Sequence, residues 1–255
     1  MTHEPYGTLA EVYEWLIPEP MLTPEGSVKA YERIVDELRS DARVLDCAAG
    51  TGELAVGLRL RGFDVTATDA NEAMIERARQ LASAHGVVLP ATVCRWEQLS
   101  EQGWSNRFDA VWCVGNSLAH APARDGRRAA LRQMARVLRP GGLLVLTSRN
   151  WELIRATGSG LRISEQLVER HGRRALVVYG WSLANRWNDR HHLDIAVAIV
   201  EPGGKVTSHA ERLAFWPFRH EDLDADIRSA GLVATFSTYD PTVDQYLVTA
   251  EPPGH

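Results

Sequence analysis

A short apolar strand that runs directly into two glycines and then a helix, in residues 44–53 (VLDCAAGTGE), most constrains what this chain folds into. Gly50 and Gly52 lack a Cβ atom, so the turn can adopt unusual backbone angles and let a ligand approach the main chain closely. In open α/β sheets, ligands bind beyond the carboxyl ends of the strands. The segment therefore predicts a ligand-binding turn between strand and helix, with a tight turn that binds nothing as the open alternative.

Short apolar runs then alternate with helical stretches along the chain. This alternation is typical of parallel sheets built from βαβ units, whose crossovers are right-handed. The predicted strands are residues 43–47, 64–68, 89–94, 108–114 and 143–148. The predicted helices are residues 52–60, 71–85 and 124–138, the last ended by the sequence Pro-Gly-Gly.

The flanking regions have different patterns. Apolar residues at three- and four-residue steps in residues 8–38 predict two amphipathic helices separated by prolines. After Asn150, longer strands and a Pro-Gly-Gly turn predict an antiparallel insertion, and a helix with two edge strands then returns to the sheet. These strands are expected at 175–183, 191–201 and 206–215, the helix at 221–230, and the edge strands at 234–239 and 245–250.

An acidic residue ends the second predicted strand, about twenty residues after the glycine turn. At this position in a nucleotide-binding α/β fold, a carboxylate accepts hydrogen bonds from a ribose hydroxyl. The residue is Asp69, and its alternative role is to cap the following helix, which Asn71 could do instead. We therefore expect Asp69 to bind a ribose.

Composition excludes several classes of protein. The 255-residue chain has a net charge of −5, which gives no positive field for nucleic-acid phosphates. Its three cysteines lack CxxC spacing, so they predict neither a disulfide framework nor a zinc site. The N-terminus does not resemble a secretory signal, and no segment has the roughly 20 apolar residues of a membrane span. We expect a cytoplasmic protein that binds no metal, membrane or nucleic acid.

Four motifs together resemble those of the class I S-adenosylmethionine methyltransferases. They are the glycine motif LDCAAGTGE, Asp69, the fourth-strand sequence FDAV at 108–111, and the turn RPGGLL at 139–144. The resemblance implies a Rossmann-like fold, that is, a doubly wound, mostly parallel seven-stranded sheet with an antiparallel insertion over the active site. It also implies S-adenosyl-L-methionine as the cofactor and S-adenosyl-L-homocysteine as the product.

A closer resemblance, to glycine and sarcosine N-methyltransferases, comes from residues 113–120 (CVGNSLAH) and 147–151 (TSRNW). In that family the residues that match Asn116 and Arg149 hold the carboxylate of the amino acid substrate. An arginine fork and an amide suit that chemistry. The insertion departs from the family, because Ile195 and the pair Phe215-Trp216 stand where relatives carry tyrosines. Trp181, Trp187 and Trp216 suggest a larger acceptor, or fill the core of the insertion, and we expect Trp216 to contact substrate.

The resemblance also implies a set of cofactor contacts. Aromatic residues near the N-terminus would lie over the sulfonium, Met74 and Trp96 would pack at the adenine, and Cys113 would offer its backbone, although a methionine at helical spacing is usually core. The expected cofactor-binding residues are Tyr6, Trp15, Asp46, Ala48, Gly50, Gly52, Asp69, Ala70, Met74, Arg95, Trp96, Cys113 and Ser117. His120 is the candidate general base, but a neutral amine held in line reacts through positioning alone.

We therefore expect a small-molecule N-methyltransferase with three parts: a cofactor-binding core at 1–150, a substrate lid at 151–216 and a return to the core sheet at 217–255. Its partner would be an amine with a carboxylate held by Asn116 and Arg149. A small-molecule O-methyltransferase and a cofactor-binding regulator without turnover are the alternatives. The sequence leaves a homo-oligomer open.

Overall fold

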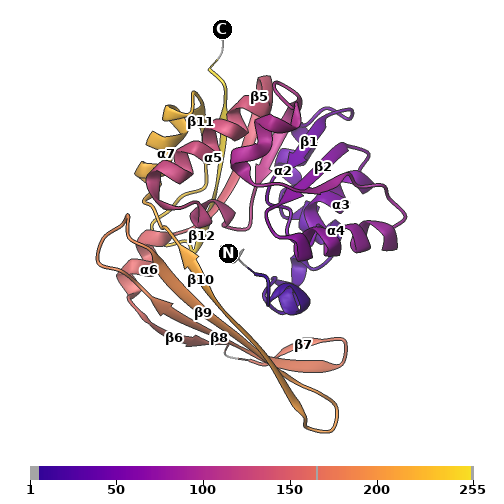
Figure 1. Ribbon diagram of the computed structural model, residues 1–255, viewed down its shortest axis with the longest axis vertical. Coiled ribbons are helices and arrows are strands. Elements are labelled where there is room, and N and C mark those ends of the chain that lie inside the picture. Colours follow the sequence, from indigo (N-terminus) through magenta and orange to yellow (C-terminus); the bar gives the residue numbers. More distant parts are fainter. Residues whose placement is uncertain (1–5, 165, 254–255) are drawn as a thin grey trace.

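The computed structural model describes residues 6–164 and 166–253, and the main body there is a seven-stranded sheet in the order β11-β12-β5-β4-β1-β2-β3 (Figure 1). Strands β1 to β5 pair in parallel, whereas β12 runs antiparallel to both β5 and β11. The strands are β1 (Arg43–Asp46), β2 (Asp64–Asp69), β3 (Ala91–Val93), β4 (Phe108–Cys113), β5 (Leu138–Arg149), β11 (Val233–Ser237) and β12 (Gln245–Glu251). The expected fold class is confirmed.

The sheet divides the core into two halves, because successive strand residues point to opposite faces. On β1, Val44 packs in one cluster with the helices that precede and follow the strand, whereas Leu45 packs in the other with α5 and α7. The helices are α1 (Pro24–Lys29), α2 (Glu32–Glu37), α3 (Glu53–Leu60), α4 (Glu72–Ala84), α5 (Ala123–Val137), α6 (Trp151–Thr157) and α7 (His220–Ser229). Short 3-10 helices are η1 (Ala10–Trp15), η2 (Glu19–Met21), η3 (Trp96–Gln102) and η4 (Ser117–His120).

The N-terminal region differs from the prediction of two amphipathic helices. It forms η1, η2, α1 and α2 instead. The prolines lie between η1 and α1, as expected, but the second predicted helix is also divided at Tyr31, whose φ of −122° and ψ of 15° leave the helical range. Pro24 opens α1, where the Thr23 Oγ1 accepts a hydrogen bond from the Gly26 N–H at 3.0 Å. The expectation for the last two strands was also partly wrong: β11 is an edge strand, but β12 lies between β11 and β5.

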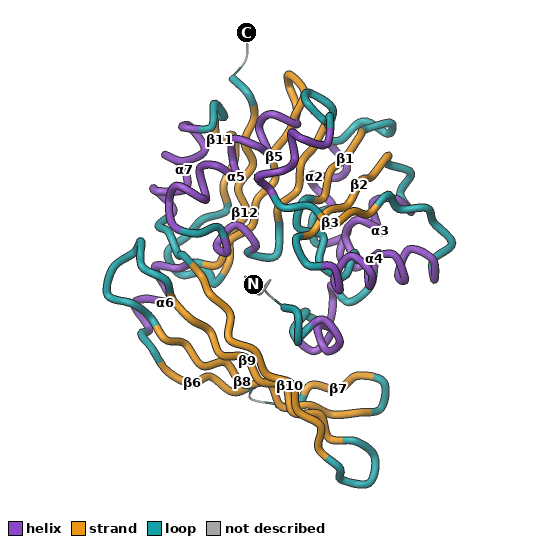
Figure 2. Tube along the Cα trace, in the orientation of Figure 1, coloured by secondary structure: helices purple, strands orange, loops and turns teal. Residues whose placement is uncertain are grey.

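A second, antiparallel sheet follows α6 and extends from the main body (Figures 1 and 2). Its strands are β6 (Gly160–Ile163), β7 (Val168–Arg170), β8 (Arg173–Ser182), β9 (His191–Val200) and β10 (Val206–Phe215). The expected turn joins β9 to β10, where the Gly204 N–H donates to the Glu201 carbonyl at 3.0 Å. The elements α7, β11 and β12 then complete the main body.

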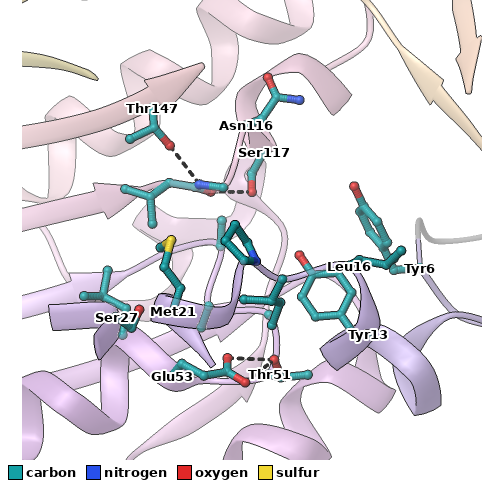
Figure 3. A pocket seen from close by; sticks show the side chains of 18 of the residues that line it. Tyr6, Tyr13, Leu16, Met21, Ser27, Thr51, Glu53, Asn116, Ser117 and Thr147 are labelled. Atoms are coloured by element: carbon teal, nitrogen blue, oxygen red, sulfur yellow. Dashed lines mark hydrogen bonds between the residues drawn. The ribbon is translucent and has the colours of Figure 1, made fainter. Parts of the chain in front are cut away.

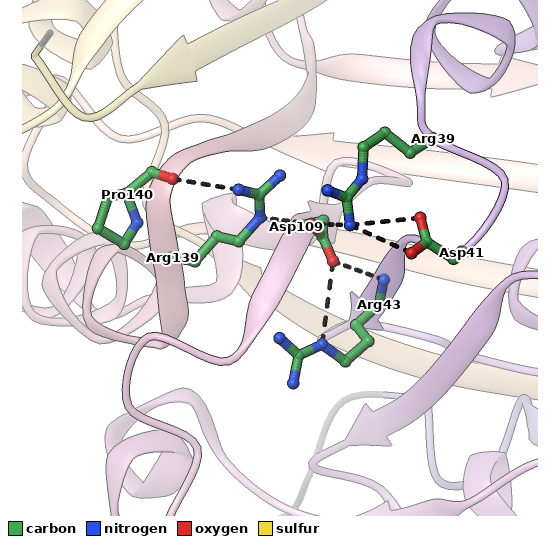
Figure 4. Close-up of polar contacts among 6 residues, drawn as sticks. All are labelled: Arg39, Asp41, Arg43, Asp109, Arg139 and Pro140. Carbon is green, nitrogen blue, oxygen red and sulfur yellow. Dashed lines mark hydrogen bonds and ion pairs between the residues drawn. The ribbon is translucent and has the colours of Figure 1, made fainter.

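The FDAV and RPGG motifs meet at the start of β4, where Asp109 and Arg139 form an ion pair (Figure 4). The Asp109 carboxylate also accepts the Arg43 N–H at 2.7 Å, and Arg39 lies 3.8 Å away. Burial raises the pKa of Asp109, but the Arg43 N–H and Arg139 outweigh burial and hold that pKa below its usual value. These two motifs therefore join β1, β4 and β5 at the ends opposite the glycine turn.

Candidate active site

A cavity of about 210 Å³ lies at the carboxyl ends of β1, β4 and β5. Its floor is the glycine loop after β1 and the loop after β4. The N-terminal segment (residues 6–18) and the antiparallel sheet form its other walls. Polar lining residues include Tyr6, Tyr13, Tyr31, Asp46, Thr51, Glu53, Asn116, Ser117, Thr147, Arg149, Tyr179 and Gln245.

The glycine loop is shaped by two left-handed residues, Gly50 (φ 53°) and Gly52 (φ 93°). The Gly50 N–H donates to the Asp69 carboxylate at 3.0 Å, which ties the loop to the end of β2. A Cβ on Gly52 would lie 2.7 Å from the Ala78 Cβ, so this glycine lets α3 pack closely against α4. Asn71 caps α4 by accepting the Ala73 N–H at 2.9 Å. The loop is thus fixed before any ligand enters.

Asp46 and Glu53 bring carboxyl groups to the cavity beside this loop. The pKa of Asp46 is raised to about 7, mainly by burial. The hydrogen bond from the Ala48 N–H lowers this pKa, whereas the nearby charges of Asp69 and Glu53 raise it. Burial also raises the pKa of Glu53, whose two oxygens accept the Thr51 hydroxyl at 2.8 and 2.7 Å (Figure 3). A cationic group in this part of the cavity would relieve the cost of ionising Asp46.

The loops after β4 and β5 are joined by side chains at the opposite wall. The Asn116 Oδ1 accepts the Arg149 N–H at 3.0 Å. The Thr147 Oγ1 accepts the Gly115 N–H at 2.8 Å (Figure 3). Ser117 donates its hydroxyl to the Val114 carbonyl at 2.7 Å. Asn116 itself is left-handed, with φ 67°, a conformation that asparagine tolerates better than most residues.

Arg149 brings a positive charge to this wall. No ion pair is formed by its guanidinium within residues 6–164 and 166–253, although the side chain is half-buried. Burial raises the pKa of the Tyr6 and Tyr179 phenols, to about 12 for Tyr6. The positive charge of Arg149 acts in the opposite direction and lowers both pKa values. The two hydroxyls therefore remain neutral hydrogen-bond donors in a cavity that they share with Arg149, which forms no ion pair with any described residue.

The antiparallel sheet supplies the apolar part of the wall. Leu193 and Ile195 of β9 and Phe215 of β10 line the cavity. Trp216, the residue after β10, is not part of the lining; its main-chain N–H donates to the Ala119 carbonyl at 2.8 Å. Trp181 is buried against Trp151, with ring centroids 5.8 Å apart, and the Arg155 guanidinium lies 4.5 Å from the Trp187 ring.

His120 lies behind the wall of the cavity. Its Nδ1 is 2.9 Å from the Ala214 carbonyl, and its ring packs 4.3 Å from Phe215, centroid to centroid. Burial lowers the pKa of His120 to about 4, although the bond to Ala214 opposes the shift. The imidazole is thus neutral near pH 7, with Nδ1–H donating to Ala214. This arrangement suits a structural role for His120.

The structure brings seven of the seventeen predicted site residues to one cavity. Those that line it are Tyr6, Asp46, Ala48, Gly50, Asn116, Ser117 and Arg149. A second group lies outside the cavity lining. It comprises Gly52 in the glycine loop, Asp69 and Ala70 at the end of β2, and Arg95 and Trp96 after β3, where the Trp96 indole N–H donates to the Cys47 carbonyl at 2.8 Å. Trp15, Met74 and Cys113 are buried side chains outside the cavity lining.

Several lining residues escaped prediction. Tyr13 had a sequence signal, since it belongs to the N-terminal aromatic group, but helical spacing suggested core. Tyr179 and Gln245 had none, because strand pairing brings them in: Gln245 of β12 pairs with Arg149 of β5.

No group of three or more His, Cys, Asp or Glu side chains suited to a metal ion was found among the described residues. No helix in the described ranges is long and apolar enough to cross a membrane.

Residues 44–142 match a family described as a methyltransferase domain. The glycine/sarcosine N-methyltransferase of Aphanothece halophytica is 38% identical over 112 residues, which are 44% of this chain and 42% of that protein. The chain thus spans less than half the length of this curated relative. The aligned region is of similar extent in the rat glycine N-methyltransferase, at 46% of this chain and 43% of that enzyme.

Solved structures are similar over almost the whole chain. The methyltransferase CcbJ from Streptomyces caelestis superposes with a TM-score of 0.77 at 21% identity, over 98% of each chain. CalS10 from Micromonospora echinaspora, an amino pentose methyltransferase solved with S-adenosylmethionine bound, superposes with a TM-score of 0.70 at 20% identity, also over 98% of each chain. At these identities the likeness is one of fold. The chain thus contains a methyltransferase domain over residues 44–142 and shares the fold of these solved methyltransferases over almost its whole length.

Proposed function

We propose that this protein methylates the nitrogen of a small-molecule amine that also carries an anionic group, such as the carboxylate of an amino acid. The observation that carries the proposal is Arg149, a half-buried guanidinium in the cavity with no acidic partner among the described residues. A charge removed from water in this way is costly unless it is paired. An anionic substrate group would supply the missing partner, with bidentate geometry.

The residues around the glycine loop suit the methyl donor. The buried Asp46 carboxyl, with its pKa raised to about 7, would gain from an α-ammonium group, and the Gly50 loop is open to a ligand because the nearest atom to an added Cβ is 3.9 Å away, on Tyr13. The Asp69 carboxylate, at the end of β2, keeps acceptor capacity for ribose hydroxyls. S-adenosylmethionine, when bound, supplies a methyl carbon on a sulfonium.

The remaining residues position the acceptor. Arg149 would bind its anion, while Asn116 fixes the Arg149 backbone through the bond to Oδ1. Leu193, Ile195 and Phe215 would exclude water from the amine. A bound donor would supply the methyl group, these residues would hold a neutral amine in line with it and free of water, and the extra proton of the ammonium product would pass to solvent afterwards. Positioning and desolvation therefore suffice, and no base is required.

O-methylation of a weakly acidic hydroxyl is the competing reaction, and it needs a base. His120 lies outside the cavity lining and its Nδ1–H faces a carbonyl, which favours N-methylation over the alternative that depends on this residue. A regulatory protein that binds the donor without turnover is the third candidate.

One experiment separates the three candidates. The purified protein is incubated with isotope-labelled S-adenosylmethionine and with panels of amino acids, amino sugars and phenols, and products are identified by mass spectrometry. The proposal expects label on the nitrogen of an amine that bears an anionic group. Label on oxygen supports the second candidate, and donor binding without any product supports the third; either result contradicts the proposal.

A further inference from the structure

Glu211, on β10, holds the N-terminal segment through three main-chain hydrogen bonds. One carboxylate oxygen accepts the Tyr6 N–H at 2.7 Å, and the other accepts the N–H groups of Thr8 at 3.0 Å and Leu9 at 3.2 Å. Hydrogen bonds to a charged acceptor are stronger than neutral ones. A single side chain therefore fixes the backbone at both ends of the turn that begins the described chain.

The turn at Tyr6 is a costly one to hold. Tyr6 has φ 67°, in the left-handed region, which costs a residue with a Cβ about 1–2 kcal/mol. The three bonds to Glu211 offset this cost and determine where the ring goes. The Tyr6 ring lines the cavity, edge-on to Tyr13 with centroids 5.4 Å apart, and edge-on to His120 at 5.5 Å (Figure 3).

Glu211 also belongs to the row of the antiparallel sheet that faces the cavity. Strand pairing places Tyr179, Ile195 and Glu211 opposite one another on β8, β9 and β10, and residues opposite each other share a face. Tyr179 and Ile195 line the cavity, and Glu211 at the edge of this row meets the N-terminal segment. These three paired residues thus both line the cavity, through Tyr179 and Ile195, and position the Tyr6 ring, through Glu211.

We propose that Glu211 is a positioning residue for the acceptor: by holding the left-handed turn at Tyr6, it keeps the Tyr6 side chain in the cavity that Arg149 also lines, where both contact the anionic group of the substrate. This inference rests on the proposed function. Glu211 itself touches neither ligand and acts through Tyr6. This assigns Tyr6 to the acceptor, whereas the family resemblance led us to expect it among the cofactor contacts. Acceptor affinity should therefore depend on Glu211, and donor affinity should not.

Glu14 provides a matched control. It is a second glutamate that joins the N-terminal segment to the antiparallel sheet, through His171 at 3.0 Å and Arg173 at 3.8 Å. These contacts are made on the surface, with the His171 side chain 71% exposed, and they hold no backbone N–H of the Tyr6 turn. Glu14→Gln therefore removes a charge from the same segment without releasing Tyr6.

The test is a double-mutant cycle on Glu211→Ala and Tyr6→Ala, with Glu211→Gln and Glu14→Gln alongside. Glu211→Ala should raise the acceptor KM about tenfold or more, leave the donor Kd within about twofold, and add nothing in the Tyr6→Ala background. Glu211→Gln, which keeps one acceptor oxygen, should fall between wild type and Glu211→Ala, and Glu14→Gln should match wild type. Additive effects, or equal losses of donor and acceptor affinity, would overturn the inference.

Failure of the proposed function is recognised separately, as absence of turnover in the wild type on any amine. Hydrogen exchange of the Thr8 and Leu9 amides then decides the positioning role of Glu211, since it needs no substrate. Exchange about tenfold or more faster in Glu211→Ala than in wild type and Glu14→Gln supports Glu211 as the residue that fixes the turn. Equal exchange in all three proteins overturns it.

Discussion

Asn116 and Arg149 are joined across the ends of β4 and β5, where the Asn116 Oδ1 accepts the Arg149 N–H at 3.0 Å. The amide that family resemblance assigns to the substrate thus also fixes the backbone of the arginine beside it. Its oxygen is committed to the protein, so only the NH₂ of Asn116 is oriented as a donor for an acceptor anion.

Asn116→Gly tests this relationship without disturbing the left-handed backbone, because glycine adopts φ 67° freely. Removing the Oδ1 leaves the Arg149 N–H unpaired, at a cost of about 1–3 kcal/mol. We expect the acceptor KM to rise about fivefold or more while the donor Kd, measured by calorimetry, changes little. A donor Kd that rises as much as the acceptor KM would show instead that Asn116 serves the donor side.

Donor binding should depend on pH through Asp46. Burial raises the pKa of Asp46 to about 7, and an ammonium group binds only its ionised form well. Since a group with pKa 7 is about nine-tenths ionised at pH 8 and one-tenth at pH 6, the donor Kd should be roughly tenfold weaker at pH 6. Equilibrium dialysis across this range measures the change. Asp46→Asn should bind donor weakly at both pH values, and a wild-type Kd that is constant with pH would refute the role.

His120 should contribute to acid sensitivity rather than to catalysis. Burial lowers its pKa to about 4, so below pH 6.5 the unfolded chain binds a proton that the folded chain does not, and stability falls with acidity. Between pH 8 and pH 5 this loss is about 2 kcal/mol. Urea unfolding of His120→Phe should lack that part of the pH dependence. The dependence of the reaction rate on pH should be the same in His120→Phe and wild type from pH 7 to 9. A changed pH dependence of the rate in the variant would show instead that His120 acts as a general base.

The close packing at Gly52 in the glycine loop can be tested with Gly62, which follows α3, as a matched control. Both are left-handed, with φ 93° and 96°, but an added Cβ would meet Ala78 at 2.7 Å in the first case and nothing within 4 Å in the second. Gly62→Ala should cost about 1 kcal/mol of unfolding free energy from backbone strain alone, and Gly52→Ala about 2–4 kcal/mol. Chemical denaturation measures both. Equal costs would mean that α3 shifts away from α4 freely.

Local chain order explains which parts of the structure were predictable. The glycine turn, Asp69 and the Asn71 cap lie within one βαβ unit, so spacing along the chain already fixes their relation. The motif residues Asp109 and Arg139 were predictable as markers of the fold. Their joint role at the opposite strand ends was not, because only strand pairing brings them together.

The walls of the cavity depend on contacts distant in sequence. Tyr179 and Gln245 reach the cavity through pairing in two different sheets, and Glu211 sets the Tyr6 turn from 205 residues away. Trp216 was expected to contact substrate; in the structure Phe215, the last residue of β10, lines the cavity, whereas Trp216 lies outside the lining. The N-terminal helices were predicted from periodicity and from the prolines between them, and the further division at Tyr31 has no signal in that pattern.

The central claim is that Arg149 recognises an anionic group on an amine. The most direct measurement compares wild type and Arg149→Ala on a matched pair of acceptors, an amino acid and its uncharged amide. Loss of a charged hydrogen-bonded contact costs about 2–5 kcal/mol, so wild type should prefer the amino acid in kcat/KM by about 30-fold or more, and Arg149→Ala should lose that preference while retaining donor affinity. An unchanged preference in Arg149→Ala, or none in wild type, would contradict the account.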